Sequence, residues 1–190
     1  MCGIVGAVAE RPITGILIEG LKRLEYRGYD SAGIAVLDDK GVTTCIKREG
    51  KVEALAAAIK QQAPAGTTGI AHTRWATHGV PSERNAHPHQ SANRFSVVHN
   101  GIIENHQELR DSLTAHGYVF ASDTDTEVIV HLIHKLSAEH LSLRSTVFAA
   151  SQKLVGAYGM VVVDSQYPDE LVVARSGSPL VIGYGVGEHF

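Results

Sequence analysis

The chain contains little of what stabilises secreted proteins or anchors proteins in membranes. Its 190 residues include two cysteines, Cys2 and Cys45, which are too few for a disulfide framework and favour a reducing compartment. No apolar run approaches the roughly 20 residues that span a bilayer. The N-terminus lacks the basic and apolar regions of a secretory signal. We therefore expect a cytoplasmic protein that does not contact a membrane.

Basic surfaces and nucleotide-binding patterns are also missing. The formal net charge is -3 with neutral histidines, and no basic block stands out, which argues against a nucleic-acid partner. No glycine-rich phosphate fingerprint follows a predicted strand, and the chain has no internal repeat or low-complexity segment. A hydrophobic fraction of 44% and a charged fraction of 19% are ordinary for a globular protein. Residues 1–190 are expected to form one domain with its own core.

Strands are expected near both ends of the chain, with groups of helices between them. Apolar runs bounded by turn residues predict strands over residues 2–9, 32–37, 42–47, 68–72, 95–99, 158–164, 171–175 and 180–184. Helical periodicity predicts a helix that opens at Pro12, and further helices over residues 52–62, 105–116, 125–139 and 143–154. Thr124 and Glu127 have the spacing of a capping box, and residues 73–93 are expected to form a long polar loop. Because strict β-α-β alternation is absent, antiparallel sheets with helical layers are favoured, which is an α+β fold.

Cys2 is distinguished by its position next to Met1. A cysteine in a strand is usually a small buried hydrophobic residue, and that interpretation is the alternative. Met1 precedes a small side chain, which normally permits its removal, and Cys2 then carries both a thiol and a free α-amino group. An α-amino group has a pKa of about 7.7–8.0 and a thiol one of about 8.5, so the amine is able to accept the thiol proton near neutral pH. Nucleophile and base would then belong to one residue.

Four blocks of sequence carry a resemblance to one enzyme family. They are Met-Cys-Gly-Ile-Val-Gly (residues 1–6), Leu-Glu-Tyr-Arg-Gly-Tyr-Asp-Ser-Ala-Gly (24–33), His-Thr-Arg-Trp-Ala-Thr-His-Gly (72–79) and His-Asn-Gly-Ile-Ile-Glu-Asn-His (99–106). Over its whole length the chain resembles the N-terminal-nucleophile glutamine amidotransferases. The second and third blocks are similar to the branch of the family that makes glucosamine 6-phosphate. The phosphoribosyl-pyrophosphate amidotransferase branch shares the first block and is the alternative, although it is expected to carry a tyrosine-serine-threonine run in the third.

The resemblance implies a fold, a reaction and partners. The implied fold is a four-layer αββα sandwich of two mainly antiparallel sheets flanked by helices. Residues 1–190 would form the glutaminase domain, truncated at its C-terminal end and without the sugar isomerase domain of the full-length enzyme. The implied reaction, which needs no cofactor, is hydrolysis of L-glutamine to glutamate and ammonia through a Cys2 thioester. In full-length members, the sugar isomerase domain of the same chain would use the ammonia to convert fructose 6-phosphate to glucosamine 6-phosphate. The resemblance implies that these full-length members are homodimers.

The resemblance assigns the oxyanion-binding donors to the dipeptide Asn100-Gly101. The Asn100 side-chain amide and the Gly101 backbone N–H would join Cys2 as the catalytic groups. Taken alone, an Asn-Gly pair is also a common type I′ hairpin turn, and that interpretation is the alternative.

The resemblance also assigns residues to the α-carboxylate and α-ammonium of glutamine. Arg74, on a loop after a strand, would clamp the carboxylate, and its alternative is a solvated surface side chain. Thr77 and His78 would add donors to the same carboxylate. Asp125 would hold the α-ammonium, and its charge also suits the first turn of a helix. Trp75 would lie beside the substrate as a gate for ammonia, or else act as a core anchor.

Two supporting residues and several histidines complete the expectations. By resemblance, Arg27 would order the N-terminal strand and His87 would support the site. A metal site is an alternative because the chain has 11 histidines, but no nearby cysteine or HExxH pattern accompanies them, so no metal is expected. The histidines weighed for it include His87-Pro88-His89 and His106. Three other functions remain as alternatives. One is a cysteine–histidine hydrolase, with a base drawn from His72, His78 or His99. The others are an N-terminal-nucleophile hydrolase with another amide substrate and a non-catalytic module that binds a metal or a partner.

Overall fold

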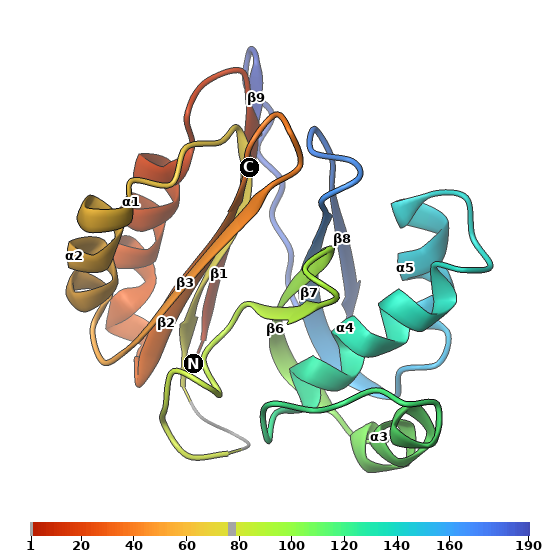
Figure 1. Cartoon of the computed structure of the whole chain (residues 1–190). Coiled ribbons are helices and arrows are strands. Elements are labelled where there is room, and N and C mark those ends of the chain that lie inside the picture. Colours follow the sequence, from red (N-terminus) through yellow and green to blue (C-terminus); the bar gives the residue numbers. More distant parts are fainter. Residues whose placement is uncertain (1, 76–78) are drawn as a thin grey trace.

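The computed structural model describes residues 2–75 and 79–190, which form two antiparallel sheets that face each other (Figure 1). The first sheet has the strand order β3-β2-β4-β1-β9. Its strands are β1 (Gly3–Ala9), β2 (Ser31–Leu37), β3 (Thr43–Glu49), β4 (Thr68–Arg74) and β9 (Glu188–His189). The second sheet has the order β5-β6-β7-β8. Its strands are β5 (His89–Ser91), β6 (Phe95–Ile103), β7 (Gly156–Asp164) and β8 (Leu171–Ser176).

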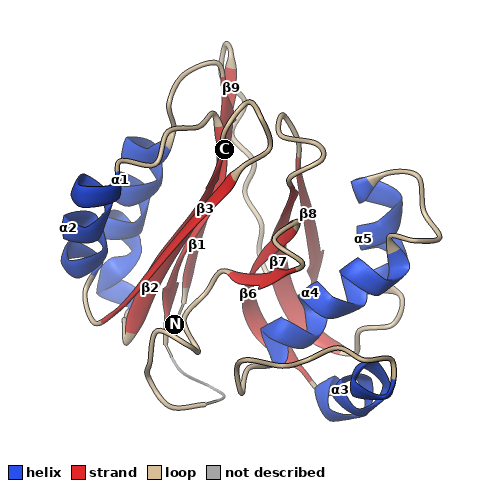
Figure 2. Cartoon of the chain, viewed as in Figure 1, coloured by secondary structure: helices blue, strands red, loops and turns tan. Residues whose placement is uncertain are grey.

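Helices cover the outer face of each sheet (Figure 2). α1 (Thr14–Leu24) and α2 (Val52–Gln62) lie on the first sheet, and a short 3-10 helix, η1 (Glu25–Arg27), follows α1. α3 (His106–Ala115), α4 (Asp125–Leu136) and α5 (Leu143–Ser151) lie on the side of the second sheet. The chain therefore has the expected α+β fold, a four-layer αββα sandwich. Within the described residues, no helix combines the length and apolar character needed to cross a membrane.

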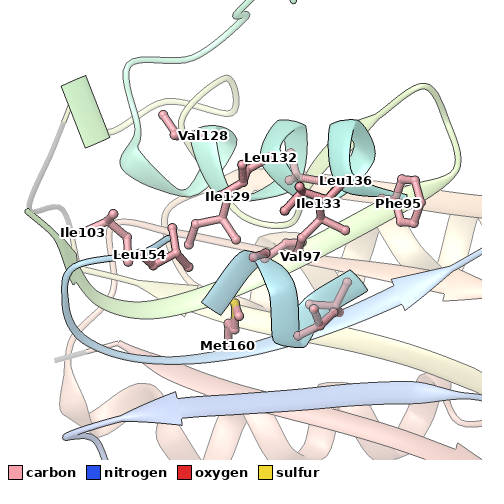
Figure 3. Close-up of a cluster of buried hydrophobic side chains, with 14 of the residues drawn as sticks. Phe95, Val97, Ile103, Val128, Ile129, Leu132, Ile133, Leu136, Leu154 and Met160 are labelled. Carbon is pink, nitrogen blue, oxygen red and sulfur yellow. The ribbon is translucent and has the colours of Figure 1, made fainter. Parts of the chain in front are cut away.

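Among the described residues, three clusters of buried apolar side chains hold the layers together. One lies between the first sheet and its helices, and it includes Leu17, Leu21 and Leu55. The largest lies beneath α4, where Ile129 and Ile133 belong to the same cluster as β6 side chains (Figure 3). Burying one such side chain contributes roughly 1.5–3 kcal/mol. The cluster between the two sheets consists of Ala35, Leu37, Ile70, Val98, Val161 and Val163.

Helix α4 begins where the sequence predicts, but the expected capping box is only half formed. The Thr124 hydroxyl accepts a hydrogen bond from the Glu127 N–H at 3.3 Å. The Glu127 carboxylate does not complete the box, because it accepts hydrogen bonds from the N–H groups of Ala121 and Ser122 at 2.8 and 2.6 Å instead. These bonds fix the segment before α4, and so they fix where Asp125 enters the helix. The helix ends at Leu136, earlier than expected.

The region between β4 and β6 contains a strand that the sequence does not predict. β5 lies inside the expected loop of residues 73–93 and pairs with β6. Ala92 and Asn93 have φ angles of 54° and 52°, and the Arg94 N–H donates to the Ser91 carbonyl at 3.1 Å, which is the pattern of a type I′ turn. A three-residue strand shows almost no alternation of apolar and polar residues, so its sequence signal is weak.

Further differences from the prediction lie near both ends of the chain. Residues 180–184 do not form a strand, because the chain instead closes a loop through hydrogen bonds between the backbones of Gly183 and Phe190. Val181 in this segment is 88% exposed, so no apolar layer covers it as it would cover a core strand. Helix α1 begins at Thr14, after Pro12 rather than at it.

Candidate active site

Strand ends from both sheets meet around one cavity of about 1260 Å³. In the antiparallel pair of β1 and β4, Gly3 lies opposite Thr73, which brings Cys2 beside the end of β4. The second sheet and α4 complete the wall, so the two halves of the fold are both needed for the site. The cavity lining includes Cys2, Arg27, Arg74, Trp75, His87, Asn100, Gly101 and Asp125. Thr77 and His78, predicted to bind substrate, and Met1, predicted to be removed, lie outside the described residues.

The Cys2 sulfur is held by the backbone of Trp75. It accepts a hydrogen bond from the Trp75 N–H at 3.1 Å and donates to the Trp75 carbonyl at 3.4 Å. Burial raises the pKa of the Cys2 thiol, while the hydrogen bond from the Trp75 N–H acts in the opposite direction. The resting sulfur is therefore a protonated thiol near neutral pH, and it needs a base to become nucleophilic.

Asn100 and Gly101 lie inside β6, so the interpretation of this pair as a hairpin turn is wrong. They pair with Gly159 and Tyr158 of β7. The Asn100 Nδ2 donates to the Cys2 carbonyl oxygen at 3.3 Å, which links the second sheet to the first. Gly101 has a φ angle of 128°, and a Cβ there would lie 2.1 Å from the carbonyl oxygen of Ala157. Glycine is therefore required at this position by both its backbone conformation and its space.

Arg74 is buried, so the solvated-surface alternative is wrong. Its side chain is 4% exposed, and it is the last residue of β4 rather than part of a loop. Its Nη1 lies 3.5 Å from the Asp30 carboxylate, and its Nη2 donates to the Gly79 carbonyl at 3.1 Å. These contacts hold the guanidinium in the cavity wall, where its planar fork suits a carboxylate ligand.

Asp125 is the first residue of α4 and is 4% exposed. Its Oδ2 accepts a hydrogen bond from the Ile103 N–H at 3.0 Å, and its Oδ1 lies 3.5 Å from the Thr126 hydroxyl. The helix N-terminus favours this negative charge, as expected from its position in the first turn. A buried carboxylate in the wall of a cavity also suits a cationic ligand, so the two expected roles are compatible.

Trp75 is 55% exposed, so the core-anchor alternative is wrong. Its ring packs on Gly28, where a Cβ would lie 2.3 Å from the Trp75 Cε3 atom. This contact fixes the segment that carries Arg27 beside the cavity. At the other end of η1, Leu24 packs on the start of β1, since a Cβ on Gly3 would lie 2.8 Å from the Leu24 Cβ.

A cluster of buried histidines lies against the cavity. The rings of His72 and His87 stack with their centroids 4.1 Å apart, and His89 and His99 lie 5.0 and 6.5 Å from His87. Burial lowers the pKa of His72 to about 3 and holds the pKa of His87 well below its usual value, so both rings are neutral at neutral pH. The Thr126 hydroxyl joins His87 Nε2 at 3.1 Å to His99 Nδ1 at 3.0 Å.

These histidines are arranged for hydrogen bonding. Within residues 2–75 and 79–190, no group of three or more histidine, cysteine, aspartate or glutamate side chains is placed to hold a metal ion. No histidine in those ranges hydrogen-bonds the Cys2 sulfur, whose contacts are with the Trp75 backbone. Of the bases in the cysteine–histidine alternative, His72 and His99 are therefore engaged elsewhere. The third, His78, lies outside the described residues.

Three side chains that shape the site were not assigned this role from the sequence. Asp30 contacts Arg74, Thr126 links two histidines, and His72 contacts Asn100. Asp30 and His72 lie within the quoted blocks, and Thr126 follows Asp125. Their positions along the chain therefore indicated that all three lie near the site. Their partners were not predictable, because each contact joins segments far apart in the sequence.

Residues 72–190 match the model of a family described as "Glutamine amidotransferase domain". This chain belongs to that family. Two of its relatives are named "Glutamine--fructose-6-phosphate aminotransferase [isomerizing]". The one from Idiomarina loihiensis is 63% identical and the one from Escherichia coli O6:H1 is 60% identical, each over all 190 residues. The chain spans 31% of the length of these relatives.

Solved structures share the fold of this amidotransferase domain. The B. subtilis glutamine phosphoribosylpyrophosphate amidotransferase, complexed with ADP and GMP, has a TM-score of 0.84 at 27% identity, and the match covers 100% of this chain and 41% of that one. A glutamine aminotransferase class-II domain protein from Silicibacter pomeroyi has a TM-score of 0.60 at 16% identity, covering 95% of this chain and 79% of that one. These matches agree with the N-terminal-nucleophile amidotransferase fold expected from the sequence.

Proposed function

We propose that this chain hydrolyses L-glutamine to glutamate and ammonia through a thioester on Cys2. The observation that carries the proposal is the meeting of the Cys2 thiol, the Arg74 guanidinium and the Asp125 carboxylate around one cavity. A nucleophile accompanied by one cationic and one anionic group suits an amino acid that carries both an α-carboxylate and an α-ammonium. No cofactor is part of the proposal.

Substrate binding follows from these charges. Arg74 binds the α-carboxylate of glutamine with its planar fork, and Asp125 binds the α-ammonium. By resemblance, Thr77 and His78 add donors to the carboxylate. Trp75 gates the passage of ammonia, Arg27 orders the N-terminal strand, and His87 supports the site. Because its α-carboxylate and its α-ammonium are both held, glutamine can direct only its side-chain amide toward Cys2.

The chemistry uses the terminal residue as both nucleophile and base. Once Met1 is removed, the Cys2 α-amine takes the thiol proton, and the sulfur attacks the amide carbon of glutamine. The Asn100 amide and the Gly101 N–H stabilise the oxyanion of the tetrahedral intermediate. The amine returns the proton to the departing nitrogen, which leaves as ammonia, and water then cleaves the thioester to release glutamate. Burial of the thiol is compatible with this assignment, because a thiol with a raised pKa needs a base, and the α-amine of the same residue would supply one.

In the whole protein, we propose that the ammonia is used to make glucosamine 6-phosphate from fructose 6-phosphate. This transfer would take place in a sugar isomerase domain of the same chain, in a cytoplasmic homodimer. The names of the relatives at 60–63% identity support this branch of the family. The alternative is a phosphoribosylpyrophosphate amidotransferase, whose B. subtilis member is 27% identical over the same residues. Assaying the intact protein with each phosphorylated sugar in turn separates the two.

The nucleophile is tested by covalent labelling with an electrophilic glutamine analogue. Intact mass before and after labelling is expected to show a chain without Met1 that gains one adduct, and peptide analysis is expected to place the adduct on Cys2. Cys45→Ala serves as the matched control because Cys45 is the other free thiol. That variant should keep both the adduct and the release of glutamate.

Two variants of the chain end test the built-in base. Cys2→Ala should abolish glutamate release, and one extra residue before Cys2 should do the same because it removes the free amine from the nucleophile. Normal glutamate release by either variant, or labelling of Cys45 in the unmodified chain, would refute the proposed function.

A further inference from the structure

His72, in the middle of β4, contacts the side chain of Asn100. The His72 side chain is fully buried, and its Nε2 lies 2.8 Å from the Asn100 Oδ1 and 3.0 Å from the carbonyl oxygen of His99. The His87 ring stacks on the imidazole at a centroid distance of 4.1 Å. This imidazole has no part in the proposed thiol chemistry or in the proposed contacts with glutamine, yet it contacts the Asn100 amide, which is the proposed oxyanion donor.

The hydrogen-bond partners determine which nitrogen of His72 carries the proton. A backbone carbonyl oxygen only accepts, so the nitrogen that faces His99 must be an N–H group. The ring is neutral because burial lowers the pKa of His72 to about 3, and a neutral imidazole has a single N–H. The proton is therefore on Nε2, and Nδ1 has no hydrogen-bond partner in the described part of the chain.

This N–H in turn determines how the Asn100 amide is oriented. An N–H group requires an acceptor, so the Asn100 atom that faces His72 is the oxygen. The Asn100 nitrogen then faces the Cys2 carbonyl oxygen, which is also only an acceptor, at 3.3 Å. The opposite orientation would set two donors against each other at His72 and two acceptors against each other at Cys2. Because an amide nitrogen has two N–H groups, the observed orientation leaves a second donor for the oxyanion.

We infer that His72 is a positioning residue, whose Nε2–H fixes the Asn100 amide with its nitrogen toward Cys2 and the oxyanion. The inference deepens the proposed function and rests on it. An oxyanion donor is effective when it is oriented before the reaction begins, and loss of one such donor lowers turnover about 10²–10³-fold. Loss of the group that orients it should lower turnover less, by about 10–100-fold, because the donor is still present part of the time.

The first test is the protonation state of His72 in the intact protein, measured by nitrogen-15 NMR of labelled histidine. The resonance pair that disappears in His72→Gln is assigned to His72. A neutral, Nε2-protonated ring between pH 5 and 8 is expected. A proton on Nδ1, or titration of the ring near its ordinary pKa, would overturn the inference. This measurement is made on the unmodified protein, so it decides the matter even where a substitution impairs folding.

The second test compares two amide variants in steady-state glutamate release. His72→Gln places its N–H group near the position of Nε2 and should retain most of the wild-type kcat. His72→Asn has the same chemistry but is one methylene too short, so its kcat should fall about 10–100-fold while KM for glutamine changes little. His131→Gln is the matched control, because His131 is a buried histidine of α4 that does not line the cavity, and its kcat should be unchanged.

A double-mutant cycle shows whether His72 acts through Asn100. In an Asn100→Ala background, His72→Asn should produce little further loss, because the group that it orients is already gone. Full additivity, equal kcat values for the two amide variants, or a loss confined to KM would each overturn the inference. If the wild-type protein itself releases no glutamate, or if Cys2→Ala does, the proposed function fails instead, so the two failures are distinguishable.

Discussion

Replacement of Gly101 by alanine should reduce turnover sharply, because the structure leaves no place for a side chain there. A Cβ would lie 2.1 Å from the Ala157 carbonyl oxygen, whereas real Cβ contacts essentially never fall under 3.0 Å. β6 would therefore have to move away from β7 by about 1 Å, and a displacement of that size at a reacting group costs about 10²-fold in rate. We expect kcat for glutamate release to fall about 10²-fold.

The backbone of Gly101 adds a cost in stability. At a φ angle of 128°, an alanine is in a sparsely populated backbone conformation that costs an L-residue about 1–3 kcal/mol. Gly117 provides the matched control, because its φ angle is 88° but a Cβ added there would meet no atom within 4 Å. Gly117→Ala should therefore show the backbone cost alone, lose less stability than Gly101→Ala and keep its kcat. Urea unfolding and steady-state kinetics measure the two quantities separately.

Two outcomes for Gly101→Ala would contradict this prediction. If the purified variant keeps kcat within about threefold of wild type, the displacement argument is wrong, since about 1 Å of movement at the oxyanion site would then have no kinetic effect. A rise in KM without a fall in kcat would contradict it as well, because it would place Gly101 in glutamine binding and not in stabilisation of the intermediate.

Two further predictions follow from the charges and the buried histidines. Arg74→Lys should raise KM for glutamine roughly tenfold or more with a smaller change in kcat, because lysine lacks the planar fork. Arg23→Lys, at an exposed arginine, is the control. An unchanged KM for Arg74→Lys would contradict the proposal that Arg74 binds the α-carboxylate of glutamine. The pKa of His72 is lowered to about 3 from an ordinary value of 6.5. Between these two pH values the unfolded chain therefore binds more protons than the folded chain. The contribution of His72 to the unfolding free energy is complete above pH 6.5 and is lost as the pH falls toward 3. One such histidine adds about 1.4 kcal/mol per pH unit to the dependence of the unfolding free energy on pH. Between pH 6 and 4, the unfolding free energy of His72→Gln, measured by urea unfolding at each pH, should therefore change less with pH than that of wild type. An equal pH dependence would contradict the burial argument.

Local patterns predicted much of the fold because they report on local structure. The helix over Val52–Gln62 was predicted to the residue and the strands β2 and β3 to within two residues, since their apolar patterns lie within the elements themselves. Predictions failed where pairing with a distant strand decided the outcome. Asn100-Gly101 has the composition of a turn, but pairing with β7 carries β6 straight through it. Residues 180–184 have the composition of a strand, but they pair with no full-length neighbour.

The sequence by itself determined the family and the α+β layering, and it named several residues that line the candidate site, because blocks around Cys2, Arg74 and Asn100 are specific even without coordinates. Only the tertiary structure decided how those residues act on one another. The burial of Arg74, the contact of His72 with Asn100 and the space that excludes a side chain at Gly101 all arise where two sheets and a helix end meet. Such contacts join residues far apart along the chain, and their geometry depends on the packing of whole layers, which no local pattern of residues encodes.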